Sequence, residues 1–244
     1  MDRKMILSVL AIAVFGFAGT MLLIPEDRDD GVPRLPWLVS TDAQGRSQVF
    51  GFTLGATTLA EVREVFGEEG KINLFAHPDR SDGYTAEAYF DQIYLNRLRA
   101  DFVITLEADQ ETLDAMYQRG LRISQLGSGD KKIALAPEDA ATLGEAAIRS
   151  ISYLPWKSLD AEIIERRFGE PARMLTEEAG VIHRLYPDKG MDIGLDSRGG
   201  VVIQYVNPAA FADAIAPLEG ASRQNAPGNE GTEPATTAPA PPQD

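Results

Sequence analysis

The chain of 244 residues contains no cysteine, two histidines and few basic residues. Without cysteine it can form no disulfide, thiolate metal site or iron–sulfur cluster and has no cysteine nucleophile, and two histidines leave little room for a histidine-rich metal centre. The 23 Lys and Arg stand against 37 Asp and Glu, which gives a formal net charge of −14. Because phosphate binding needs a basic face, nucleic acid is not expected as a partner, whereas a partner with a basic patch is favoured.

Motifs of the common enzyme classes are missing as well. The sequence has no G-x-S-x-G nucleophile elbow, no H-E-x-x-H zinc motif, no EF-hand loop and no G-x-G-x-x-G dinucleotide fingerprint. The run Gly127–Lys132 (GSGDKK) has the composition of a phosphate-binding loop. It lacks the P-loop spacing and precedes a strand, so it predicts a hairpin turn. We therefore expect no cofactor, no metal and no catalytic activity.

The segment Met5–Ile24 carries no charged residue over 20 positions. About 20 apolar residues are needed to span the hydrocarbon layer of a membrane. An uncleaved single-pass anchor is favoured, because the apolar core of a signal peptide is usually shorter; the alternative is a cleaved signal peptide with Gly16 and Ala18 before the cut. Arg3 and Lys4 place the N-terminus in the cytoplasm. We expect a bacterial inner-membrane protein with its bulk in the periplasm.

Composition divides the rest of the chain. After the anchor (residues 1–24), residues 25–48 contain three prolines and many charges and are predicted to be a linker. Residues 220–244 are rich in Pro, Ala, Thr and Gly without an aliphatic cluster, which is typical of a disordered tail. The folded part is therefore expected at residues 49–219.

Two segments of the folded part form a weak internal repeat. Both Leu54–Glu68 and Leu154–Pro171 show an amphipathic helical pattern followed by Phe-Gly-Glu. Thr58 and Glu61 have the spacing of a capping box, and Ser158 is a plausible N-cap of the second helix.

After each helix the hydrophobic period shortens to about 2, which is typical of strands separated by turns. Residues 49–108 and 148–219 are each predicted to form a helix followed by an antiparallel meander, and residues 109–147 a helix–hairpin–helix connector. With the transmembrane helix and the disordered tail, the expected class is α+β, with helices on one face of the sheet.

The Leu-Gly, Thr, Val and Phe-Gly positions of Leu54–Gly67, followed by a meander, resemble the SmpA/OmlA (BamE-like) family of small envelope proteins. The tandem copies look like β-lactamase inhibitor protein, which has two such units. Residues 87–92, 167–171 and 183–196 also resemble a family of membrane-anchored proteobacterial proteins. The resemblance implies a small layered fold used for protein–protein contacts. BamE-like proteins carry a lipid on a cysteine that this chain lacks, so their outer-membrane partner is not carried over.

Four residues are candidate partner contacts. Trp37 lies in the Pro-rich approach segment, where an exposed indole could anchor a partner; packing onto the edge of the domain is the alternative. Trp156 is the second candidate, while the other aromatic residues are expected mostly in the core. Lys131 and Lys132 form an isolated basic spot on an acidic protein.

His183 lies in a predicted strand, with Tyr186 and Asp192 nearby in the following hairpin. One interpretation is a general base oriented by a carboxylate. No nucleophile or oxyanion motif accompanies it, so we favour a strand histidine that pairs across the hairpin with Asp192. His77 precedes Pro78 in a polar loop and is expected at the surface.

These observations favour a membrane-tethered periplasmic module that binds an envelope protein, as a scaffold, an assembly factor or an inhibitor. One alternative is binding of a small ligand or lipid between the two copies, which needs a cavity of about 300 Å³ or more. The other is a hydrolase or transferase that uses His183 with Asp192 or Tyr186.

Overall fold

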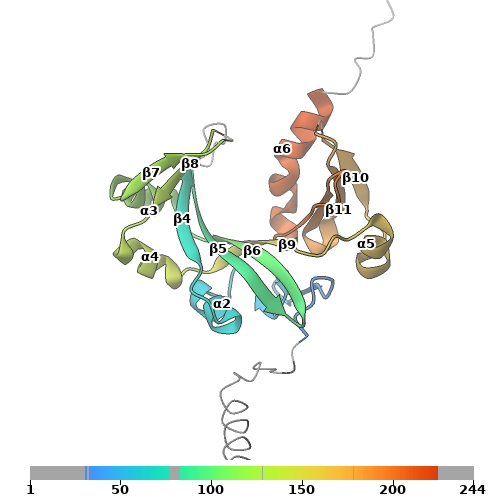
Figure 1. The fold of residues 1–244 in the computed structure, drawn as a ribbon, viewed down its shortest axis with the longest axis horizontal. Helices are drawn as coiled ribbons and strands as arrows, with labels where there is room; N and C mark the ends of the chain where they lie inside the picture. Colours follow the sequence, from blue (N-terminus) through green and yellow to red (C-terminus); the bar gives the residue numbers. More distant parts are fainter. Residues whose placement is uncertain (1–30, 32, 77–82, 128, 178, 225–244) are drawn as a thin grey trace, which may run out of the picture.

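A computed structural model describes residue 31 and residues 33–76, 83–127, 129–177 and 179–224. Its main feature is a ten-stranded antiparallel sheet with the strand order β10-β11-β12-β13-β9-β6-β5-β4-β8-β7. A three-stranded sheet in the order β1-β2-β3 lies beneath its centre, as Figure 1 shows.

Most strands and all the helices are short. The strands are β1 (Ser40–Thr41), β2 (Ser47–Val49), β3 (Phe52–Thr53), β4 (Lys71–Ala76), β5 (Tyr84–Leu95), β6 (Leu98–Leu106), β7 (Arg122–Gln125), β8 (Lys131–Ala134), β9 (Ile148–Pro155), β10 (Arg173–Thr176), β11 (Ile182–Tyr186), β12 (Met191–Leu195) and β13 (Val201–Tyr205). The helices are α2 (Leu59–Phe66), α3 (Gln110–Gln118), α4 (Pro137–Gly144), α5 (Ala161–Phe168) and α6 (Phe211–Gln224), with the 3₁₀ turns η1 (Pro187–Lys189) and η2 (Pro208–Ala210).

Strand β9 joins the two halves of the chain. Its residue Ile151 pairs with Ile104 of β6 on one side and with Tyr205 of β13 on the other. Because both edges of β9 are paired, the two meanders that flank it become one sheet. The α+β class predicted from the sequence, with its tandem units, is therefore wrong: the described chain is mainly β, with one ten-stranded and one three-stranded sheet.

The helix caps follow local sequence. The capping box of α2 is confirmed: the Glu61 backbone N–H donates to Thr58 Oγ1, and the Thr58 N–H donates to Glu61 Oε2 at 2.7 Å. In α5 the N-cap is Asp160, whose carboxylate accepts from the Ile163 N–H at 2.7 Å, rather than the expected Ser158.

The two faces of the large sheet are covered differently. One face of the large sheet packs against β1–β3 and helices α2 to α5, and we call it the core face. Buried residues of these elements join one hydrophobic cluster: Phe52, Leu59, Met116, Leu143 and Phe168. Helix α6 packs on the opposite face, through Phe211 and Ile215 against Leu185. In Figure 1 the two ends of the sheet rise on either side of β5, β6 and β9, and α6 covers this opposite face at the β10–β13 end. We call the opposite face the open face.

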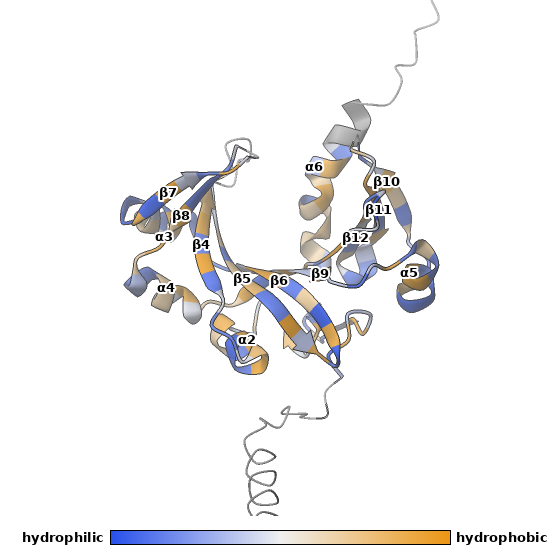
Figure 2. Cartoon of the chain, in the orientation of Figure 1, coloured by the Kyte–Doolittle hydropathy of each residue, from blue (hydrophilic) through white to orange (hydrophobic). Residues whose placement is uncertain are grey.

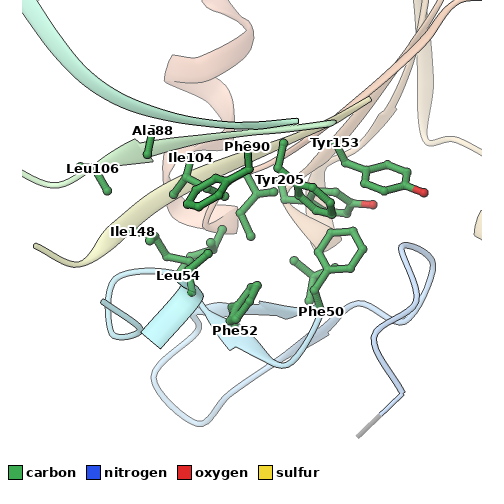
Figure 3. Packing of buried hydrophobic residues seen from close by; sticks show 14 of the residues in the cluster. Phe50, Phe52, Leu54, Ala88, Phe90, Ile104, Leu106, Ile148, Tyr153 and Tyr205 are labelled. Carbon is green, nitrogen blue, oxygen red and sulfur yellow. The ribbon is translucent and has the colours of Figure 1, made fainter. Parts of the chain in front are cut away.

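Aromatic rings fill the junction between the sheets. Phe50, between β2 and β3, is 1% exposed, and its ring centroid lies 5.3 Å from those of Phe102 and Tyr153 and 5.6 Å from that of Tyr205. Figure 3 shows Phe50 and Phe52 pointing up toward the underside of the large sheet. The small sheet thus supplies the core under β6, β9 and β13, where the two halves of the chain meet.

Residues expected to be a linker belong to this fold. Strand β1 begins at Ser40, and the buried Tyr205 hydroxyl donates to the Pro36 carbonyl oxygen at 2.8 Å. At the other end α6 continues to Gln224, into the segment expected to be disordered; residues 225–244 lie outside the described residues.

The expectation of a transmembrane helix, and of an inner-membrane location, needs correction. The segment Met5–Ile24 that carried it lies outside the described residues. Among the helices that the structure does describe, none is both long enough and apolar enough to cross a membrane.

Candidate functional site

Alternation along the strands places polar and aromatic side chains on the open face. Figure 2 shows hydrophilic and hydrophobic residues alternating along β5 and β6. Seven side chains of β4, β5, β6 and β8 line a pocket of about 210 Å³ on this face: Lys71, Asn73, Phe75, Glu87, Tyr89, Val103 and Lys132. This pocket lies within the first half of the chain, rather than between the two expected copies, and its lining is mixed polar and apolar.

Next to the pocket lies an aromatic cluster, which we define as Tyr89, Tyr94, Arg99, Asp101 and Trp156. The guanidinium carbon of Arg99 lies 3.4 Å from the centroid of the Trp156 ring and 5.6 Å from that of Tyr94. Stacking of this kind between a cation and aromatic rings is favourable. Tyr94 is 65% exposed and Trp156 is 52% exposed, so the stack is presented to solvent.

Asp101 organises this cluster. Its carboxylate accepts hydrogen bonds from Trp156 Nε1 at 2.9 Å, from the Tyr89 hydroxyl at 3.2 Å and from the Gln92 backbone N–H at 2.8 Å. Burial raises the pKa of Asp101, but these hydrogen bonds and the charge of Arg99 outweigh burial and lower it overall. Asp101 therefore stays ionised near neutral pH and fixes the indole.

A β-bulge brings these residues together. The register between β5 and β6 shifts between Phe90 and Ile93, and Gln92 has a φ of 59°. The bulge aims the Gln92 N–H at Asp101, and the Gln92 side-chain oxygen accepts from Arg99 Nη2. Bulges often redirect side chains at functional sites.

The other candidate partner contacts have different environments. Trp37 is half-buried, with its ring edge-on to Phe168 at 6.4 Å and beneath Arg167 at 4.6 Å, so it packs onto α5. Lys132 is half-buried in the pocket wall, and Lys131 is exposed at the end of β8. Trp156 was predicted from the sequence as a partner contact, and that role stays a prediction. Its neighbours Tyr94 and Asp101 were not predicted, because their meeting depends on the bulge.

His183 is buried and faces two carboxylates. Its Nδ1 lies 2.7 Å from Asp192 Oδ2, and its Nε2 lies 3.3 Å from Glu177 Oε1. Tyr186, three residues further along the strand, faces away from them, and its hydroxyl donates to the Gly169 carbonyl oxygen at 2.9 Å. The structure thus brings His183 and Asp192 together without Tyr186, as a buried pair rather than an open catalytic site.

This pair predicts a pH-dependent stability. The hydrogen bond to Asp192 raises the pKa of His183 above its ordinary value of 6.5; burial opposes this, and the charges of Asp192 and Glu177 add to it. Since the folded state favours the protonated ring, its stabilisation is complete below about pH 6.5 and is lost as pH rises through the raised pKa. Between about pH 6 and pH 9, the urea midpoint of the wild type should fall more than that of His183→Gln. If the urea midpoint of the two proteins fell equally with pH, His183 would not be the group that causes the pH dependence.

Comparison with known proteins adds no candidate function. No protein-family model, no curated protein and no solved structure matches the chain. The resemblance to the SmpA/OmlA family stays a prediction from short motifs.

Proposed function

We propose that the protein binds a partner protein through its open face, with the aromatic cluster as the anchor. The observation that carries this proposal is the solvent-exposed stack of Trp156, Arg99 and Tyr94. Trp, Tyr and Arg are the residue types that contribute most to binding energy at protein interfaces. The rings of Trp156 and Tyr94 also expose apolar surface to water, and its burial by a partner would be favourable.

The cluster is fixed before any partner arrives. Trp156 is held by Asp101, and Arg99 is held by Gln92. Immobilising a flexible side chain on binding costs about 0.5–1.5 kcal/mol. Side chains that are already held avoid much of this loss, which supports a binding role for the cluster.

The pocket beside the cluster supports the same function. Tyr89 lines the pocket and also donates to Asp101, so the two features adjoin. A volume of about 210 Å³ is below the roughly 300–1,000 Å³ of most small-molecule sites. It suits one side chain of a partner that covers the cluster.

The overall charge of −14 favours a partner with a basic surface. Attraction between surfaces of opposite charge speeds association and is weakened by salt. We expect the association rate to fall as ionic strength rises, with a smaller effect on dissociation.

Substitutions in the cluster test the proposal. Full-length wild type and the variants Trp156→Ala and Arg99→Ala would be crosslinked in cells that naturally produce the protein, and captured proteins quantified by mass spectrometry. A partner whose capture falls about 30-fold in both variants is expected, because loss of a central anchor costs about 2 kcal/mol or more.

The matched control is Met174→Ala. Met174 is 51% exposed, which is close to the 52% of Trp156. Met174 lies on β10, an end strand of the large sheet far from the aromatic cluster. Its capture profile should equal that of the wild type, and circular dichroism should show that all variants fold. A set of captured proteins that no cluster substitution changes would contradict binding through this cluster.

A further inference from the structure

A second group of exposed apolar side chains lies on and beside strand β7. Leu121 is 67% exposed, Ile123 51% and Leu126 38%. Strand β7 is the last strand of the large sheet, and among the described residues it pairs with β8 alone. A free, apolar strand edge is a template for another strand, and natural sheets usually protect such edges.

The backbone at this edge has groups available for a further strand. In an antiparallel pair, alternate residues direct their N–H and C=O groups toward the partner strand. The Leu126 N–H donates to the Asp130 carbonyl oxygen at 2.8 Å, so Ser124, two residues earlier, also directs its groups at β8. The backbone groups of Ile123 and Gln125 therefore point away from β8, toward the free edge.

The opposite edge of the sheet, β10, is better protected. Helix α6 packs beside it, and Arg173 of β10 forms an ion pair with Glu219 of α6. Met174 is the large apolar residue exposed there. The contrast makes β7 the edge suited to docking and β10 a matched control.

Charge indicates which kind of strand would dock at β7. The hairpin of residues 121–135 contains Arg122, Lys131 and Lys132 against the single acid Asp130, within a chain of net charge −14. A second copy of the chain would bring two such basic hairpins together, which is unfavourable. An extended segment with carboxylates would instead meet opposite charge.

We propose that β7 docks an extended acidic segment of a partner protein, which adds as an eleventh strand to the large sheet. In this mode backbone hydrogen bonds give affinity, and alternate side chains give specificity. Ile123 pairs with Ile133 on the core face, and Arg122 lies on the open face. The docked segment therefore has an apolar residue opposite Ile123 and, next to it, a carboxylate opposite Arg122. This site is separate from the aromatic cluster and does not depend on it.

A fluorescent peptide of alternating valine and glutamate tests the proposal by anisotropy on the full-length protein. Wild type should bind it, and Ile123→Pro should weaken binding at least 10-fold, since proline removes an N–H that points to the free edge and leaves the β7–β8 bonds intact. Met174→Pro removes the corresponding outward N–H of β10 and should bind like the wild type. Arg122→Glu keeps every backbone group and should also weaken binding about 10-fold, so the test stands if the proline variant folds poorly.

Four results would overturn the proposal. The first is no binding of the peptide to the wild type. The second is equal binding by the wild type and Ile123→Pro. The third is equal binding of a peptide with lysine in place of glutamate. The fourth is a concentration-dependent dimer that Ile123→Pro abolishes, because a second copy would then occupy the edge. Trp156→Ala should bind the peptide normally, which keeps this test distinct from that of the aromatic cluster.

Discussion

Replacing Gly190 with alanine is expected to leave the protein unfolded or to lower its free energy of unfolding by about 4 kcal/mol or more. Gly190 lies in the turn between η1 and β12, with φ 59°. A Cβ atom there would lie 2.0 Å from the Val206 carbonyl oxygen and 3.0 Å from the Pro208 nitrogen. Both contacts are with backbone, and the Val206 N–H donates to the Gly190 carbonyl oxygen at 2.8 Å. Relieving the clash therefore requires a backbone shift, either of this turn or of the segment that follows β13.

The control for this prediction is Gly45→Ala. Gly45 has φ 78°, and a Cβ atom built there meets nothing within 4 Å. The Gly45→Ala variant therefore loses only the free energy of placing alanine in the left-handed conformation, about 1–2 kcal/mol. Urea unfolding followed by circular dichroism compares the two variants. Similar losses at both positions would show that the contact between Gly190 and Val206 is looser than the structure has it.

Replacing Phe50 with alanine is expected to lower the free energy of unfolding by about 3–5 kcal/mol, as for other fully buried phenylalanines. The ring contacts Phe102 of β6, Tyr153 of β9 and Tyr205 of β13. Its loss leaves a cavity at the point where both halves of the chain and the small sheet meet. The whole sheet should therefore unfold in one transition at lower urea concentration.

Tyr94→Ala serves as the control for this second prediction. Tyr94 is an aromatic residue of similar size but is 65% exposed. Its removal should change the free energy of unfolding by about 0.5 kcal/mol or less. If Phe50→Ala were as mild, the small sheet would not form part of the common core.

Features set by neighbouring residues could be predicted from the sequence. The capping box of Thr58 and Glu61 and the presence of strands after each helix depend on local spacing. The structure contains both, with β4 and β12 among these strands. Strand β9 was missed. Its alternation is broken at Ile148, where the register with β6 shifts, so Ile148, Ser150 and Ile151 are all buried. Because β9 was not predicted, the sequence indicated two separate units, whereas the structure has a single sheet.

The candidate site likewise combines features that could be predicted from the sequence with features that could not. Trp156 follows a proline near a helix start and could be identified from the sequence alone. Its partners depend on strand register and on the bulge at Gln92, which brings Asp101 and Arg99 under the indole. For His183, the pairing with Asp192 across a short hairpin was predictable, whereas Glu177 approaches from the β10–β11 turn and was not.

Site-specific photocrosslinking tests partner binding at the aromatic cluster most directly. A benzophenone amino acid would be placed at position 94, or at position 174 as the matched exposed control, in the full chain within its natural host cells. Position 94 should crosslink to a defined partner protein, and Trp156→Ala in the same chain should abolish that product, while position 174 should not yield it. A partner captured equally from both positions, or unaffected by Trp156→Ala, would contradict the cluster as the binding site.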